Sequence, residues 1–125
     1  MKLKLLLALT AVALSGCQTT SVHELQTNAS PQVIRDAQEM LNPYKHLNVT
    51  DNGVIEYEEA VPSGYEWSHV HIKEISYRLA CEDLADFLKQ GMIVRMSFKG
   101  RGGMINDYDQ TRCENEESPT KLYKS

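Results

Sequence analysis

The chain contains no apolar run long enough to span a bilayer. Its longest such run, Leu5 to Leu14, has ten residues and is interrupted only by Thr10, whereas a spanning helix needs about 20. Basic residues are dispersed, with 13 Lys and Arg against 17 Asp and Glu, so no nucleic-acid partner is expected. The sequence also lacks a Gly-x-Ser-x-Gly elbow, a phosphate-binding glycine loop before a helix and a Cys-x-x-Cys pair. No enzyme activity and no cofactor are therefore predicted.

What is present begins with an export signal. Two lysines, the apolar run and small residues lead to Leu14-Ser15-Gly16-Cys17, the order of a signal peptide. The last four residues resemble the lipobox of bacterial lipoproteins, whose cysteine is acylated on sulfur and, after cleavage, on its amine. We expect a signal peptide over residues 1–16 and a lipid anchor on Cys17, since two or more acyl chains hold a protein stably. An ordinary secreted protein with a chance cysteine is the alternative.

The residue after the cysteine bears on the destination. Gln18 stands where an Asp tends to retain enterobacterial lipoproteins at the inner membrane. Resemblance to that rule favours the periplasmic face of the outer membrane. The remaining chain suffices for one domain, predicted over residues 30–113. Residues 17–29 are expected to form the lipidated start and a flexible tether that reaches roughly 20 Å, and residues 114–125 a frayed polar tail.

Two cysteines remain after Cys17 is assigned to the anchor. Cys81 and Cys113 form an even pair in an oxidising compartment, where thiols within reach normally form a disulfide. Closing this loop would stabilise the domain by roughly 3 to 4 kcal/mol. A redox or metal pair is the alternative, but no His lies beside either cysteine.

The first half of the domain predicts a helix and a hairpin. Ser30 and Pro31 form a helix start, and Asn42-Pro43 ends the helix. Strands over 46–51 and 54–61 flank Asn52-Gly53, a dipeptide that favours a type I′ turn. The second strand has no cleanly apolar face, which predicts an edge or half-covered strand.

The second half predicts a long helix and another hairpin. Apolar residues recur at helical spacing over 66–90, with a break expected near Glu82-Asp83, and alternate over 92–99. A returning strand is expected over 104–112. The core-facing stripe of the helix is predicted to comprise Val70, Tyr77, Ala80, Cys81, Leu84, Phe87 and Leu88, widened by Ile72, Ile75 and Leu79. The fold class is thus α+β, with a four-stranded antiparallel sheet packed by helices and one disulfide.

Residues Trp67 to Ile75 leave an alternative open. Val70 and Ile72 alternate with His69, His71 and Lys73, as in a strand. On a strand the two histidines would share a face and could bind a metal, whereas on a helix they point about 200° apart. No third ligand is near in the sequence, and no metal site is predicted.

The order of these elements resembles a known class of secretion lipoproteins. After the lipobox and polar segment come a helix, a hairpin and Ser76-Tyr77-Arg78-Leu79-Ala80-Cys81, and then Gly91 opens a hairpin that ends Asp109-Gln110-Thr111-Arg112-Cys113. Over residues 30–113 this pattern is similar to the α/β pilotins of type II secretion systems. Arg112 departs from the Thr of that family.

The resemblance implies a carrier rather than an enzyme. Pilotins are outer-membrane lipoproteins that bind the C-terminal segment of a secretin subunit and travel on the lipoprotein-sorting machinery, taking the secretin to its membrane. An amphipathic segment could dock in a partly apolar groove. Residues expected to contribute are Trp67, Val70, Tyr77, Met92, Val94 and Met96, because aromatic and Met side chains dominate such interfaces. A general envelope lipoprotein with a structural or inhibitory protein-binding role is the alternative function.

Overall fold

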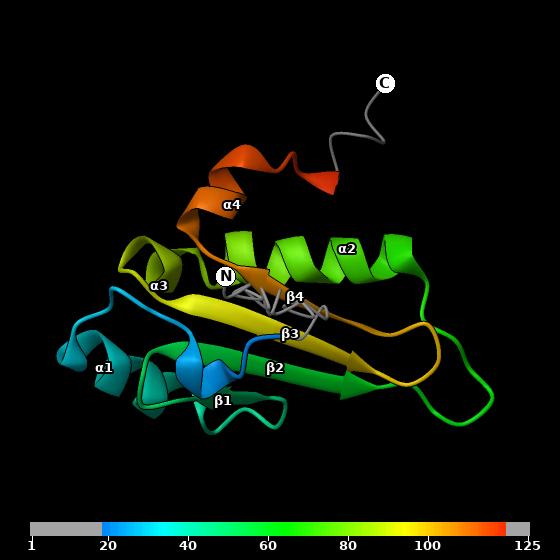
Figure 1. Cartoon of the computed structure of the whole chain (residues 1–125), viewed down its shortest axis with the longest axis horizontal. Helices are drawn as coiled ribbons and strands as arrows, with labels where there is room; N and C mark the ends of the chain where they lie inside the picture. The colour runs from blue at the N-terminus through cyan, green and yellow to red at the C-terminus, as the bar shows by residue number, and fades with distance from the viewer. Residues whose placement is uncertain (1–18, 120–125) are drawn as a thin grey trace, which may run out of the picture.

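The computed structural model describes residues 19–119, so the expected signal peptide, Cys17 and residues 120–125 lie outside the described residues. The fold is α+β, as predicted (Figure 1). None of the helices between residues 19 and 119 is long and apolar enough to cross a membrane. The elements are η1 (Val22–Glu24), α1 (Pro31–Leu41), β1 (Leu47–Val49), β2 (Val54–Ala60), α2 (His69–Tyr77), η2 (Arg78–Asp83), α3 (Ala85–Lys89), β3 (Ile93–Lys99), β4 (Met104–Tyr108) and α4 (Gln110–Asn115).

One mixed sheet holds all four strands in the order β1-β2-β3-β4. The two hairpins are antiparallel, but β2 and β3 are parallel, with Ile55 opposite Val94. The prediction of a fully antiparallel sheet is therefore wrong for the middle pair. The chain crosses from β2 to β3 through the long helical region, and such a crossover brings two strands together in parallel. Strand β2 lies inside the sheet, so the edge alternative for this strand is wrong. Its side chains change from buried at Val54 and Ile55 to exposed at Glu58 and Ala60, which agrees with the half-covered alternative.

The first helix and the first hairpin are confirmed. Ser30 Oγ accepts a hydrogen bond from the amide of Val33 at 3.3 Å, and helix α1 ends at Leu41. The turn between β1 and β2 is not type I′, because only Gly53 has a positive φ, at 92°. The Gly53 amide donates to the carbonyl of Thr50 at 3.2 Å. A three-residue loop with one left-handed glycine thus replaces the two-residue turn.

The long helical region is confirmed as helix but begins later and changes its winding. Ser68 caps α2, so residues 66–67 precede the helix. Residues 78–83 form a π-helix, η2, and the chain breaks at Leu84 before α3, close to the predicted break. The predicted stripe is wrong at its start, because Val70 is 60% exposed while Ile72 is fully buried. The strand alternative for residues 67–75 is excluded by the observed helix.

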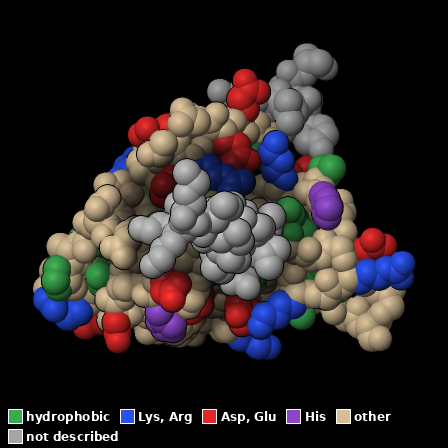
Figure 2. Space-filling view, in the orientation of Figure 1, with side chains coloured by type: hydrophobic (Ala, Val, Ile, Leu, Met, Phe, Trp, Pro, Cys, Tyr) green, Lys and Arg blue, Asp and Glu red, His purple; other side chains and the backbone are tan. Residues whose placement is uncertain are grey.

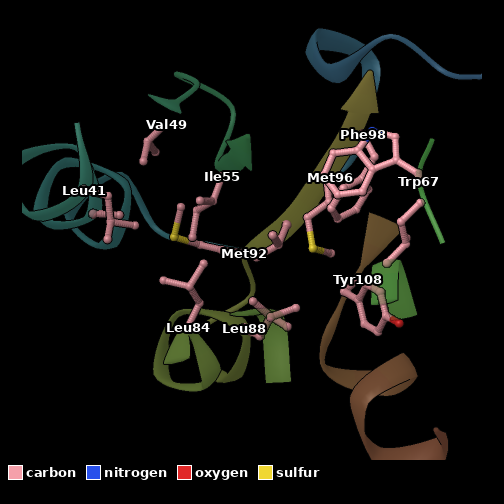
Figure 3. Packing of buried hydrophobic residues seen from close by; sticks show 14 residues of the cluster. Leu41, Val49, Ile55, Trp67, Leu84, Leu88, Met92, Met96, Phe98 and Tyr108 are labelled. Atoms are coloured by element: carbon pink, nitrogen blue, oxygen red, sulfur yellow. The ribbon is translucent and has the colours of Figure 1, made fainter. Parts of the chain in front are cut away.

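The helices bury one face of the sheet, which we call the first face. It carries Ile55 on β2, Val94, Met96 and Phe98 on β3, and Tyr108 on β4. Figure 3 shows Leu84 and Leu88 directed toward Met92 and Ile55 at one end of this core. Trp67 packs edge-on against Phe98 at the other end, with ring centroids 5.0 Å apart. A single hydrophobic core thus joins the helical layer to the sheet.

The last hairpin leads into a helix rather than a longer strand. Strand β4 ends at Tyr108, and Asp109 Oδ1 accepts from the amide of Arg112 at 2.8 Å to begin α4. The predicted Cys81–Cys113 disulfide is present, and it joins η2 to α4. Residues 114 and 115 belong to α4, so the expected frayed tail does not start at residue 114.

The opposite side of the sheet, the second face, carries the alternate side chains of the strands, among them Glu56, Arg95 and Asp107. The N-terminal segment crosses this face in front of β2 and β3 (Figure 1). The amide of Asn28 donates to the carbonyl of Gly91 at 3.0 Å. The described part of the expected tether is therefore docked on the domain rather than extended away from it.

Candidate functional site: a groove between α2 and the edge strand

Three of the six predicted binding residues belong to the core. Met92, Val94 and Met96 are at most 1% exposed and form part of the buried hydrophobic cluster. Figure 3 shows Met92 and Met96 surrounded by other core side chains. Because the helical layer covers the first face of β3, these residues cannot contact a partner in this conformation. Their assignment to the binding surface is therefore corrected.

The other three predicted residues have different environments. Trp67 is buried, and its Nε1 donates to the carbonyl of Lys99 at 2.8 Å, so its polar group is already satisfied inside the fold. Val70 lies exposed on α2, and Tyr77 is half-buried at the end of the same helix. These two residues are seven positions apart and share a helix face. Only this part of the predicted set is accessible.

A groove of about 270 Å³ lies between α2 and β4, and α4 closes one end. Strand β4 is at the edge of the sheet, and among residues 19–119 no strand pairs with its outer side. The groove is thus bounded by a helix on one side and by an open strand edge on the other. Its lining residues are His69, Ile72, Lys73, Met104, Asn106, Tyr108, Arg112 and Glu116.

The middle of the groove is apolar. Ile72 from α2 and Tyr108 from β4 are buried, and Met104 at the start of β4 is 38% exposed. Lys73 lies on the surface of α2 three residues after Val70, so the two side chains are neighbours on the helix. The groove therefore offers apolar contact area beside a cationic group.

The end of the groove near α4 is charged and tightly connected. The Arg112 guanidinium lies over the Tyr108 ring, 3.9 Å from its centroid, and its Nε donates to Glu116 Oε2 at 3.0 Å. The Tyr108 hydroxyl donates to Glu116 Oε1 at 3.0 Å. Burial, followed by this hydrogen bond, raises the pKa of Tyr108 to about 12. These contacts hold the end wall in one arrangement at neutral pH.

The geometry does not assemble a metal centre from the histidines. His69 and His71 lie on α2, where residues two apart point about 200° from each other. In the part of the chain that is described, no group of three or more His, Cys, Asp or Glu side chains could hold a metal ion. His69 instead lines the groove.

Sequence reasoning missed the residues that β4 contributes. Met104, Asn106 and Tyr108 share the first face because strand residues alternate. Their alternation was visible in the sequence, but their position at a sheet edge depends on the order of the four strands. The placement of Arg112 depends on α4, whose cap at Asp109 was the available signal.

Comparisons with protein families, curated proteins and solved structures gave no match.

Proposed function

We propose that this chain is a type II secretion pilotin, an outer-membrane lipoprotein that binds the C-terminal segment of a secretin subunit and delivers it for assembly. The groove between α2 and β4 carries the proposal, because it combines an apolar floor, a cationic rim and an open strand edge. Folded domains capture short peptides on surfaces of this kind.

The groove fits an amphipathic segment better than a compact ligand. Its volume of about 270 Å³ is just below the usual range for drug-sized molecules, and it is bordered by exposed apolar side chains. A bound peptide would place apolar residues against Ile72 and Met104, with Val70 widening the contact. Lys73 at the rim would attract an acidic residue of the peptide, which favours selectivity more than affinity.

The lipid anchor and the sorting pathway complete the proposal. Acylation of Cys17 would hold the protein at the periplasmic face of the outer membrane and would make it cargo of the lipoprotein-sorting machinery. A secretin bound in the groove would travel with it. A Cys17→Ser variant should fold and bind the peptide but should mislocalise the secretin, and normal secretin assembly in that variant would count against the carrier function.

The binding step is tested with a matched pair of variants on one strand. Met104 lines the groove, whereas Ile105, 47% exposed, projects from the second face. Met104→Asp should weaken binding of a secretin C-terminal peptide at least tenfold, or about 1.4 kcal/mol. Ile105→Asp introduces the same charge and should change the affinity less than about threefold.

Titration calorimetry with peptides from the C-terminus of the cognate secretin measures both affinities. Absence of binding by the unmodified protein would refute the pilotin function. Equal weakening by the two variants would refute the groove as the site. Capture of a different envelope protein, with no secretin peptide bound, would support the alternative of a general protein-binding lipoprotein.

A further inference from the structure

The N-terminal segment is fixed to the domain at several points along its length. The side-chain amide of Asn52 donates to the carbonyls of Val22 and Leu25, at 2.8 and 3.1 Å. The hydroxyl of Thr27 donates to the carbonyl of Asn52. Asn52, in the β1–β2 turn, thus bonds to three residues of the segment. These bonds explain why an asparagine is found at this position, although its φ is not positive.

Two glycines lie where the segment meets the domain backbone. A Cβ atom on Gly53 would come within 2.7 Å of Thr27 Oγ1, and one on Gly91 within 2.7 Å of the carbonyl carbon of Asn28. Real Cβ contacts are longer, so any larger residue would displace the segment or the turn. The N-terminal segment therefore packs closely against the domain at two separate glycines.

The start of the segment is bound on the second face. Arg95 of β3 pairs with Asp107 through its Nε and Nη2, at 2.7 and 2.8 Å, and its remaining Nη1 donates to the carbonyl of Thr20. Because the Asp107 pair fixes the plane of the guanidinium, the donor to Thr20 has a defined direction. The chain thus reaches the domain at Thr20, beside β3 and β4.

We propose that residues 20–28 form a docked strap, so that a lipid anchor on Cys17 would turn the second face of the sheet toward the bilayer. This inference rests on the lipid anchor of the proposed function. From Cys17 to Thr20 the chain has three steps, which span at most about 11 Å. A free tether over residues 18–29 would instead reach roughly 20 Å.

The strap has a consequence for the groove. The groove opens beside α2 and the first-face side chains of β4, on the opposite side of the sheet from Thr20. A domain seated on its second face would present the groove to the periplasm. Figure 2, seen from the side of the second face, shows both acidic and basic side chains on the visible surface, which could contact the charged groups of lipid headgroups.

The experiment uses the mature, acylated protein in vesicles of phosphatidylethanolamine and phosphatidylglycerol that contain a dansyl-labelled headgroup lipid. Trp67 is the single tryptophan, so energy transfer from it reports the height of the domain above the headgroups. Asn52→Ala removes the bonds to Val22 and Leu25 and loosens the strap, so the transfer efficiency should fall as the domain moves outward. Thr27→Val removes one bond without disturbing the β1–β2 turn and should give a smaller decrease.

Asn48→Ala is the matched control. Asn48 also lies in the β1–β2 hairpin and donates a single side-chain bond, to Glu56 Oε2 at 3.0 Å, but it does not bond to the strap. Its energy transfer should equal that of the unmodified protein. Hydrogen exchange at the Asn28 amide should accelerate at least tenfold in Asn52→Ala and should stay unchanged in Asn48→Ala.

The possible failures are distinguishable. Equal energy transfer in the unmodified protein and in Asn52→Ala would overturn the strap while leaving the anchor and the groove intact. Absence of an acyl group on Cys17 by mass would overturn the bilayer contact together with the anchor of the proposed function. Peptide binding should be unaffected by Asn52→Ala, so a failure of the groove would be detected separately at Met104.

Discussion

Removal of the Cys81–Cys113 disulfide should lower the free energy of unfolding by about 3 to 4 kcal/mol. The bond joins η2 to α4 across 32 residues, with the two Cα atoms 5.4 Å apart. In the chain-entropy treatment, a loop of this length reduces the entropy of the unfolded chain by about 12 cal/mol/K, equivalent to about 3.7 kcal/mol at 25 °C. Small domains have a total free energy of unfolding of about 5–15 kcal/mol, so the disulfide contributes a large part of the stability of this domain.

The assay is urea unfolding of the mature protein with and without a phosphine reductant, compared with the Cys81→Ala/Cys113→Ala double variant. The reduced protein and the double variant should agree within about 1 kcal/mol, since both lack the loop constraint and differ only in two half-buried side chains. The double variant should not respond to the reductant, which controls for other effects of the phosphine.

Amide hydrogen exchange shows which part of the structure loses stability when the disulfide is reduced. Helix α4 has six residues, too few to be stable without tertiary contacts. Its amides should exchange rapidly once the bond is reduced, and the end wall of the groove formed by Arg112 and Glu116 should loosen with it. A loss below about 1 kcal/mol, with α4 still protected, would refute the loop-entropy reasoning and would show that packing alone holds α4.

Three further predictions test the packing and the charges with four single substitutions. Ile72→Ala should cost about 2–5 kcal/mol and Val70→Ala less than about 0.5 kcal/mol in urea unfolding; equal costs would contradict the observed helix orientation. Ser76 is fully buried, and its hydroxyl has no hydrogen-bond partner among the described residues, so Ser76→Ala should be neutral or stabilising by about 1 kcal/mol in the same assay. The pKa of Tyr108 is raised to about 12 and returns to about 10 on unfolding. The unfolded state releases this proton first, so stability should fall by about 1 to 2 kcal/mol as the pH rises between these values. Tyr108→Phe should lose this part of the slope in unfolding measured at about pH 9 and about pH 11, and an unchanged slope would refute the assignment.

Sequence signals predicted those helices and turns that depend only on residues close together in the chain. The Ser30 cap and the following proline fixed the start of α1, and glycine punctuation located both hairpins. In each case the physical reason lies within a few residues: a hydroxyl that accepts an amide bond, or a backbone angle that glycine alone adopts cheaply. The disulfide was also predictable, because Cys81 and Cys113 are the two cysteines left once Cys17 is assigned to the expected anchor, and such a pair forms a bond in an oxidising compartment.

Features that depend on distant parts of the chain were not predictable in this way. The parallel pairing of β2 and β3 depends on where the helical region crosses the sheet, and the mixed polarity of β2 arises because its two faces contact different layers. Residues 20–28 have the composition of a flexible tether, yet they are bound by Asn52 and Arg95. Amino-acid composition indicates how polar the side chains of a segment are. It does not indicate whether the backbone carbonyls of the segment accept hydrogen bonds from the domain, and these carbonyls are the groups that bind to Asn52 and Arg95 here.

The helical layer shows most clearly how backbone geometry changes the meaning of a sequence pattern. Five buried residues occur at intervals of four: Ile72, Ser76, Ala80, Leu84 and Leu88. In a regular α-helix each interval of four rotates about 40° past a full turn, so the last residue would lie about 160° from the first. The π-helical turn, in which the Leu84 amide donates to the carbonyl of Leu79 five residues back at 2.9 Å, and the break that follows absorb this rotation. The wider turn follows α2, keeps Ala80 and Leu84 on the buried side with Ser76, and leaves Cys81 beside α4 for its disulfide. The π-helical turn therefore determines which residues after Tyr77 face the core, and the Cys81–Cys113 disulfide that follows from it holds α4 at the end of the groove.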